Sequence, residues 1–166
     1  MPLVDFASLP DDARCWVFGA RAPLDDVDAP RLLKAVDRFL KDWKAHGHPL
    51  TCAREFRDEH FLVIGVDETA SDASGCSIDG LFKLLQEAEK GIGTSMVGGG
   101  LVHFRDTLGL VHCVTRGDFG AMAQDGDVTS ATPVFDATIS TVGDYRARFE
   151  VPAGKAWHAS LLPTAG

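Results

Sequence analysis

The fold is decided by the stretch Thr51-Cys52-Ala53-Arg54-Glu55-Phe56-Arg57-Asp58-Glu59-His60-Phe61-Leu62-Val63-Ile64-Gly65-Val66. In residues 51–57 apolar and polar side chains alternate, as they do in a strand with one buried face. Residues 60–66 are almost continuously apolar, as in a strand that is covered on both faces. Because only Asp58 and Glu59 separate the two segments, the stretch predicts a β-hairpin in the middle of a sheet.

An amphipathic helix is predicted before this hairpin. Asp28 is a suitable N-cap, Pro30 fits the first turn, and Gly47 stops the run. The apolar residues between them recur at helical spacing and predict one buried stripe: Leu32, Leu33, Val36, Phe39, Leu40 and Trp43.

A second amphipathic helix is predicted after the hairpin, over residues 78–90. Ser77 is its expected N-cap and Gly91 its stop. Its inward stripe consists of Ile78, Leu81, Phe82, Leu85 and Ala88.

The remaining chain predicts shorter elements. Strands are expected at 14–18, 101–105, 110–115 and 133–139, and short helices at 118–124 and 142–149. Thr141 and Asp144 have the spacing of a capping box for the last helix. The fold class is therefore α+β, a mainly antiparallel sheet with two main helices packed on it and short C-terminal helices. We expect one domain over residues 1–166, in which residues 116–166 could form a small C-terminal lobe.

Composition excludes several classes of partner. The chain has 166 residues, of which 45% are hydrophobic, and a net charge of −8. An acidic protein repels phosphate groups, so we expect neither nucleic acid nor an anionic membrane as partner. Residues 1–6 lack the pattern of a signal peptide, and the apolar runs are too short to span a bilayer. These features predict a cytoplasmic protein, whose four separate cysteines are expected to be free thiols.

The connection between the apolar strand and the second helix is rich in polar groups. It contains Asp67 and Glu68 at the end of the strand, then Cys76, Ser77 and Asp79 at the start of the helix. Functional carboxylates often follow buried strands in this way. Glu68, Ser77 and Asp79 are therefore candidate ligand-binding residues.

Cys76 is a candidate nucleophile because it precedes the expected N-cap. The positive end of a helix dipole favours a thiolate there, although Asp79 would oppose it. His46 is the candidate base, with His48 and His60 as alternatives, and Asp67 would orient it. The competing interpretation, which we favour, is that Ser77 and Asp79 only cap the helix while Cys76 faces the core.

Several sites can be set aside on their spacing. A divalent cation on Asp67, Glu68 and Asp72 does not fit the EF-hand pattern, and zinc on Cys76 and the histidines beside Gly47 matches no common zinc motif. The phosphate loop, the dinucleotide fingerprint and the serine nucleophile elbow are absent. We therefore predict no metal and no cofactor.

A set of short motifs is spread over nearly the whole chain: Trp16-Val17-Phe18, Trp43, His46-Gly47, Pro49, Asp67-Glu68, Gly75-Cys76-Ser77-Ile78-Asp79, Pro152-Ala153 and Trp157-His158. In these the chain resembles a family of small uncharacterised bacterial proteins, some of which are labelled "ABC transporter ATPase". The resemblance implies kinship without a mechanism. The missing phosphate loop contradicts the ATPase label for this chain.

Together these features predict a non-enzymatic binding or interaction protein whose functional surface is the 67–79 loop with residues 46–49. Its partner would be a protein or a small molecule. The alternative is a thiol- or acid-based enzyme, with Cys76 as nucleophile or redox centre, His46 as base and Asp67 orienting the base.

Overall fold

The N-terminal part of the chain forms a three-stranded antiparallel sheet. The computed structural model describes residues 3–68, 75–92, 94–96 and 100–164, without the side chains of residues 75 and 76. Strands β1 (Arg14–Gly19), β4 (Thr51–Arg57) and β5 (Phe61–Asp67) lie in the order β1-β5-β4. The predicted hairpin is β4–β5, and its turn residues Asp58 and Glu59 have φ of 55° and 59°. Positive φ at two successive residues is typical of the turn that matches strand twist.

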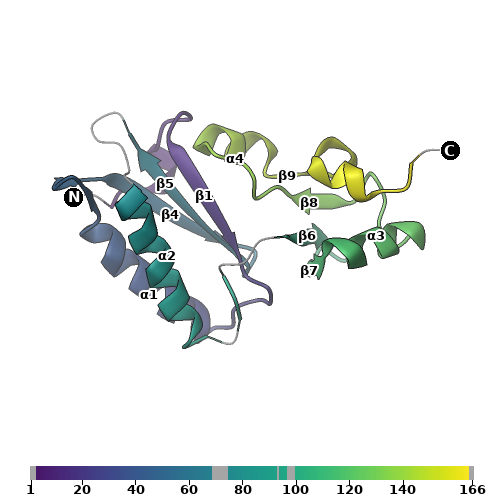
Figure 1. The fold of residues 1–166 in the computed structure, drawn as a ribbon, viewed down its shortest axis with the longest axis horizontal. Coiled ribbons are helices and arrows are strands. Elements are labelled where there is room, and N and C mark those ends of the chain that lie inside the picture. Colours follow the sequence, from purple (N-terminus) through teal and green to yellow (C-terminus); the bar gives the residue numbers. More distant parts are fainter. Residues whose placement is uncertain (1–2, 69–74, 93, 97–99, 165–166) are drawn as a thin grey trace.

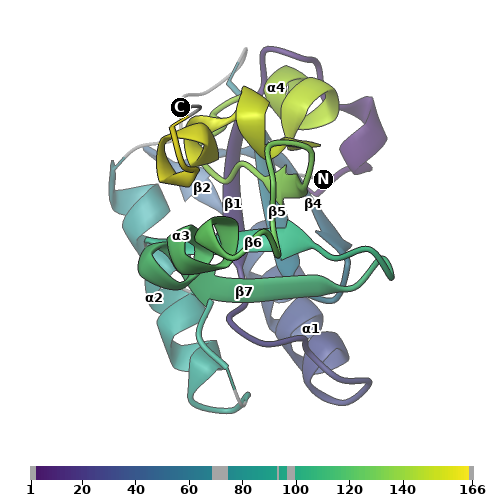
Figure 2. The same cartoon turned by 90° about the vertical axis from the view of Figure 1, so that its right-hand side faces the viewer.

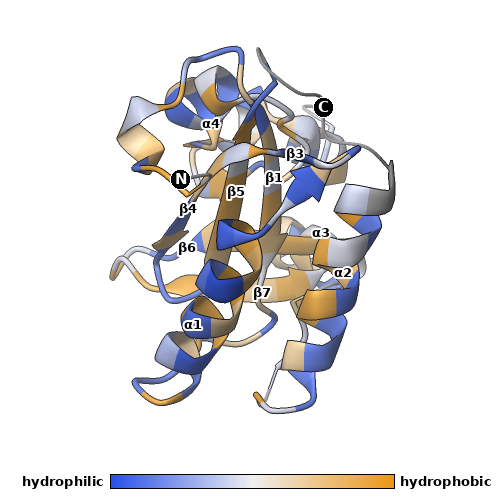
Figure 3. Ribbon diagram, turned by 90° about the vertical axis from the view of Figure 1, so that its left-hand side faces the viewer, coloured by the Kyte–Doolittle hydropathy of each residue, from blue (hydrophilic) through white to orange (hydrophobic). Residues whose placement is uncertain are grey.

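The two faces of this sheet have separate cores. Because side chains alternate along a strand, Leu62 and Ile64 of β5 lie on one face while Phe61 and Val63 lie on the other. Helices α1 (Asp28–Lys41) and α2 (Gly75–Glu89) cover the first face (Figure 1). In Figure 3 the hydrophobic strands β1 and β5 lie behind these helices. The structure thus confirms that the two main helices pack on the sheet.

The second face packs against the C-terminal part of the chain and the N-terminal segment. Helix α4 (Val142–Arg148) lies on this side of the sheet, opposite α1 and α2 (Figure 1). A short 3-10 helix, η1 (Phe6–Ser8), also lies here. The buried residues of this layer are Leu9, Ala13, Cys15, Ala53, Phe61, Val63, Phe135, Ile139, Val142, Tyr145 and Phe149.

Helix α1 differs from its prediction at both ends. The helix begins at Asp28 with Val27 as its N-cap, so Asp28 is not the cap; Asp25 Oδ1 accepts from the backbone N–H groups of Val27 and Asp28, at 2.9 and 2.7 Å. The helix ends at Lys41, before Trp43. Trp43 nevertheless stays in the core, where 4% of its surface is exposed.

A small hairpin that the sequence did not predict follows α1. Its strands are β2 (Lys44–Ala45) and β3 (His48–Pro49), which pair antiparallel. His46 and Gly47 form its turn with φ of 52° and 79°. Gly47 is therefore a hairpin residue and not the helix stop.

Helix α2 begins earlier than the sequence indicated. It starts at Gly75, so Ser77 lies in its first turn and is not the N-cap. The Ser77 hydroxyl donates to the carbonyl of Lys44 at 2.7 Å, and Trp43 Nε1 donates to the carbonyl of Ser77 at 2.8 Å. These two bonds attach the first turn of α2 to Trp43 and to Lys44, the first residue of β2.

A second antiparallel sheet lies beyond the first. Its order is β7-β6-β8-β9, from β6 (Leu101–Arg105), β7 (Val111–Thr115), β8 (Pro133–Phe135) and β9 (Glu150–Pro152). Helix α3 (Arg116–Gln124) and two 3-10 segments, η2 (Ala153–Lys155) and η3 (Trp157–Leu161), complete this part. Figure 2 shows β7 crossing in front of β1 and β5. The core of this sheet contains Val102, Phe104, Phe119, Ala123, Val128, Val134 and Ala153.

Two local predictions for this region have different outcomes. The expected strand 133–139 ends at Phe135, because the Asp136 carboxylate accepts from Thr138 N at 2.9 Å and turns the chain. The cap of α4 is confirmed, since Thr141 Oγ1 accepts from Asp144 N at 3.1 Å.

The α+β class is confirmed, although the strands divide into separate sheets. Phe61 of β5 and Phe135 of β8 share one core, which joins the two larger sheets. One domain over 1–166 stays a prediction, as does a lobe at 116–166; the second sheet also includes residues 101–115. Among the helices that the structure describes, none is both long and apolar enough to cross a membrane.

Candidate functional site

Strand β1 lies at the edge of the first sheet, and its backbone pairs with β5 on one side only. Backbone groups of an antiparallel strand alternate between its two sides. Cys15 N donates to Ser140 O at 2.9 Å, away from β5, so the odd-numbered residues face outward. The N–H and C=O groups of Val17 and Gly19 therefore belong to the outer edge.

This outer edge is closed at both ends and open between them. The Ser140 contact closes one end, and a bond of 3.1 Å from Arg21 N to Ser95 O closes the other. Between these contacts, the outward backbone groups of Val17 and Gly19 make no hydrogen bond with any described residue. Unpaired groups on a strand edge are a template for pairing with another chain.

A cavity of about 640 Å³ lies along this open edge. This volume is in the usual range for ligand pockets. Its walls come from β1, α2, β6, the start of α3, the segment after β8 and η3. The lining residues are Cys15, Trp16, Val17, Phe18, Gly19, Phe82, Met96, Gly100, Leu101, His103, Arg116, Phe135, Ala137, Thr138, Ile139 and Trp157.

The cavity is apolar and aromatic, with one cationic side chain. Arg116 is the only Lys, Arg, Asp or Glu among its described lining residues. The guanidinium lies 4.8 Å from the centre of the Trp157 ring, which holds it in place. Within the described part of the chain, Arg116 forms no ion pair.

His103 forms part of the wall against β1. Its Nε2 donates to the carbonyl of Ala20 at 2.8 Å, and its ring packs so tightly on Gly19 that a Cβ there would lie 2.7 Å from His103 Cε1. Burial lowers the pKa of His103, which keeps the ring neutral at pH 7. His60, one of the alternative bases, lies beside this ring, is 4% exposed and donates from Nδ1 to the carbonyl of Asp58 at 2.8 Å.

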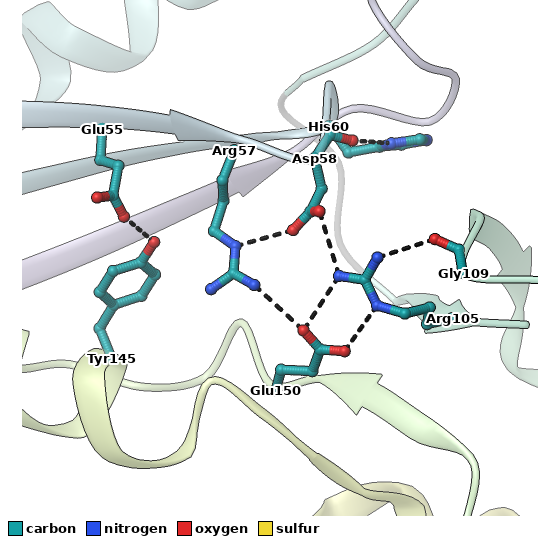
Figure 4. Close-up of polar contacts among 8 residues, drawn as sticks. All are labelled: Glu55, Arg57, Asp58, His60, Arg105, Gly109, Tyr145 and Glu150. Carbon is teal, nitrogen blue, oxygen red and sulfur yellow. Dashed lines mark hydrogen bonds and ion pairs between the residues drawn. The ribbon is translucent and has the colours of Figure 1, made fainter.

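An ionic network fixes the second sheet against the first (Figure 4). Arg105 of β6 donates to Glu150 of β9 from Nε at 2.8 Å and to Asp58 from Nη2 at 3.1 Å. Arg57 donates to the same two carboxylates, at 2.8 Å to Asp58 and 3.1 Å to Glu150. Burial alone would raise the pKa of Asp58, but these two arginines outweigh it and lower the pKa. The network therefore holds the two sheets that form the cavity in one arrangement.

A second polar contact joins α4 to β4. The Tyr145 hydroxyl donates to the carboxylate of Glu55 (Figure 4). Burial raises the pKa of Tyr145, and the bond to Glu55 raises it further against an opposing effect of Arg57. Tyr145 thus remains a neutral donor across the physiological range.

The described cysteines near the core are protected from ionisation. Burial raises the pKa of Cys15 and of Cys52 to about 12, and Glu55 adds to the effect at Cys15. Only the thiolate is alkylated, so at pH 8 we expect both to react with iodoacetamide on the order of 1,000-fold more slowly than a free thiol. Peptide mass mapping of native and guanidinium-unfolded protein measures this. Fast labelling of Cys15 in the native protein would contradict the core arrangement.

The same experiment tests the alternative enzymatic prediction. Cys76 lies outside the residues whose side chains the structure describes, so its pairing with His46 and Asp67 stays a prediction. Fast labelling of Cys76 well below pH 8 that is lost in His46→Ala would support a thiol enzyme. A slow profile that His46→Ala leaves unchanged would contradict it.

The other predicted site residues gather at one end of the first sheet. Asp67 ends β5, where it pairs in register with Thr51. The next residue, Glu68, lies with Oε1 3.6 Å from Nη1 of Arg14. Asp67 and Glu68 therefore both lie at the C-terminal end of β5, next to the start of β1 at Arg14.

The start of α2 belongs to this end as well. Ser77 is buried against Lys44, two residues before His46, which lies exposed in the β2–β3 turn. Asp79 is exposed on α2. The structure therefore brings β2, the end of β5 and the first turn of α2 together, whereas residues 69–74 lie outside the described residues. Among the described residues, no three His, Cys, Asp or Glu side chains are grouped to hold a metal ion.

Comparisons with known proteins add no relative. No protein-family model, no curated protein and no solved structure matches the chain. The resemblance to the bacterial family stays a prediction from its motifs.

Sequence reasoning did not find the cavity. Trp16 and Trp157 are present in the motifs that carry the family resemblance, but Arg116 and His103 belong to no functional motif, although His103 lies in the predicted strand 101–105. Strand order, which leaves β1 at an edge, cannot be read from local periodicity.

Proposed function

We propose that this protein is a binding protein whose ligand is an extended peptide segment, added as a short strand to the outer edge of β1. The observation that carries this proposal is the pair of unbonded residues, Val17 and Gly19, inside a cavity with apolar walls. The proposal keeps the predicted class of a binding or interaction protein. It places the main surface at β1 instead of the 67–79 loop.

Backbone geometry favours a peptide over a compact small molecule. The outward groups of Val17 and Gly19 are two residues apart, which is about 6.8 Å along a strand. Each offers a donor and an acceptor in the direction of a missing neighbour strand. An extended backbone satisfies all of these groups with its own alternating N–H and C=O groups.

The walls suit the side chains of such a segment. Strand side chains point alternately to the two faces, so a ligand strand beside β1 presents residues to both. Phe82 and Met96 belong to the core on the α1–α2 side of the sheet, whereas Ile139 and Trp157 belong to the cores formed with the C-terminal part of the chain. Burying apolar side chains against them contributes about 25 cal/mol per Å² of surface removed from water.

Hydrogen exchange tests the open edge before any ligand is known. In the free protein we expect slow exchange at the amides of Trp16 and Phe18, which pair with β5, and fast exchange at Val17 and Gly19. A peptide selected from a phage-displayed library should then slow exchange at Val17 and Gly19. Slow exchange at these two amides in the free protein would contradict the proposal. A selected peptide that slowed amide exchange only near Asp67, and not at Val17 and Gly19, would also contradict it.

Val17→Pro removes one outward donor and leaves the β1–β5 pairing intact. Proline is tolerated on edge strands when its position needs no N–H for the ladder. We expect at least about 10-fold weaker binding of the selected peptide than in the matched control Val17→Ala, which keeps the N–H. Fluorescence anisotropy measures binding, and melting temperatures confirm that both variants fold. Equal affinities would contradict strand addition; if Val17→Pro does not fold, the exchange pattern of the unaltered chain decides.

A further inference from the structure

We infer that the segment bound along β1 is the free C-terminal end of a partner polypeptide, with its terminal carboxylate held by Arg116. This inference rests on the proposed function, since it specifies the ligand of the same groove.

Charge indicates an anionic ligand group. The chain carries 24 acidic residues against 16 Lys and Arg, yet no Asp or Glu is among the cavity's described lining residues. Six other arginines have carboxylate partners: Arg14, Arg54, Arg57, Arg105, Arg146 and Arg148. Arg116 instead stacks on Trp157, so its forked donors are left for a group from outside. A guanidinium matches a carboxylate with two parallel hydrogen bonds.

The geometry of the edge selects a chain end over a chain that passes through. Ser140 and Ser95 close β1 on the two sides of the open residues Val17 and Gly19. A continuous strand would have to leave the edge at both closures. A chain end has to enter only once, and the cationic Arg116 repels an amino terminus while it attracts a carboxyl terminus.

Arg116 is also placed beside the apolar wall. It follows Thr115, which pairs in register with Leu101, and Leu101 lines the cavity. Leu101 and Trp157 thus lie next to the position of the carboxylate. We therefore expect an apolar residue at the last position of the bound chain.

The test compares free and blocked chain ends. One phage library displays random peptides with a free C-terminus, and a second displays them at an N-terminus, so that each peptide is joined onward. Selected sequences are made as fluorescein-labelled peptides in two forms, a C-terminal acid and a C-terminal amide. We expect selection from the first library, and at least about 10-fold tighter binding of the acid.

Variants assign this preference to Arg116. In Arg116→Gln the acid and the amide should bind equally, and Arg116→Lys should keep part of the preference because it retains the charge without the fork. Arg38→Gln is the matched control, since Arg38 is exposed on α1 and does not line the cavity. It should leave the preference unchanged.

The outcomes separate the inference from the proposed function. Equal binding of acid and amide, while Val17 and Gly19 still gain protection, overturns the C-terminal inference and leaves the strand-binding function standing. Loss of binding when an internal Glu or Asp of the peptide is replaced by its amide also overturns it, in favour of a side-chain carboxylate. If no peptide from either library protects Val17 and Gly19, both fail.

Discussion

Replacing Trp43 by alanine is expected to lower the free energy of unfolding by about 3–5 kcal/mol. The indole is 4% exposed and packs against Trp16 and Phe39, with ring centres 6.4 and 5.6 Å away. It also donates from Nε1 to the carbonyl of Ser77, a bond that joins the chain after α1 to α2. Alanine removes all of these contacts and leaves a cavity between the two helices and the sheet.

Urea denaturation followed by circular dichroism measures this loss. Trp43→Phe is the matched control, because it keeps an aromatic ring but loses the N–H donor. Its expected cost is smaller, about 1–3 kcal/mol. If Trp43→Ala cost less than about 1 kcal/mol, the placement of Trp43 in the core would be wrong.

The second large effect is a loss of stability in acid that depends on His158. This side chain is fully buried, and neither ring nitrogen has a hydrogen-bond partner among the described residues. Burial lowers the pKa of His158 from 6.5 to about 4; nearby Asp136 opposes this shift, while Arg116 and His103 add to it. The unfolded chain therefore binds a proton at a higher pH than the folded chain does.

Well above pH 6.5, His158 is neutral in the folded and in the unfolded chain, so its protonation does not change the free energy of unfolding. As the pH falls from 6.5 to 4, protonation increasingly favours the unfolded chain, and about 3 kcal/mol of stability is lost.

Urea denaturation of the protein and of His158→Phe over this pH range measures the contribution. His103 adds a loss of the same sign, because burial lowers its pKa too, so the decisive quantity is the difference between the two pH slopes. We expect His158→Phe to remove the His158 part of the slope. It should also be the more stable protein at pH 7, since two buried nitrogens without partners are removed. Identical slopes would show that His158 is accessible to solvent.

The parts of the fold that follow from local periodicity were predictable. The alternation in residues 51–57 and the apolar run 60–66 gave the central hairpin, and apolar spacing gave α1 and α2. Gly47 was misread because a glycine with positive φ serves equally in a helix stop and a hairpin turn. The strand β9 (Glu150–Pro152) is too short to show any period.

The candidate site depended on information that local sequence does not hold. Asp67 does end the predicted apolar strand, but Ser77 lies inside the first turn of α2 and is not the predicted N-cap, and a functional role for these residues stays a prediction. The open edge of β1 arises from strand order, and it is closed by Ser95 and Ser140, which lie 74 and 125 positions along the chain from their partners Arg21 and Cys15. Arg116 reaches the same cavity only through the packing of the second sheet on the first.

The closures at the ends of β1 have a consequence for the free protein in a crowded solution. Exposed strand edges are where identical chains join into fibrils, and strands in folded proteins are ordinarily about 5–6 residues long. Here Cys15 and Arg21 are already engaged, which leaves only Val17 and Gly19 for a newcomer. The opening on β1 therefore admits a short tail but offers too few backbone groups for this edge to template polymerisation.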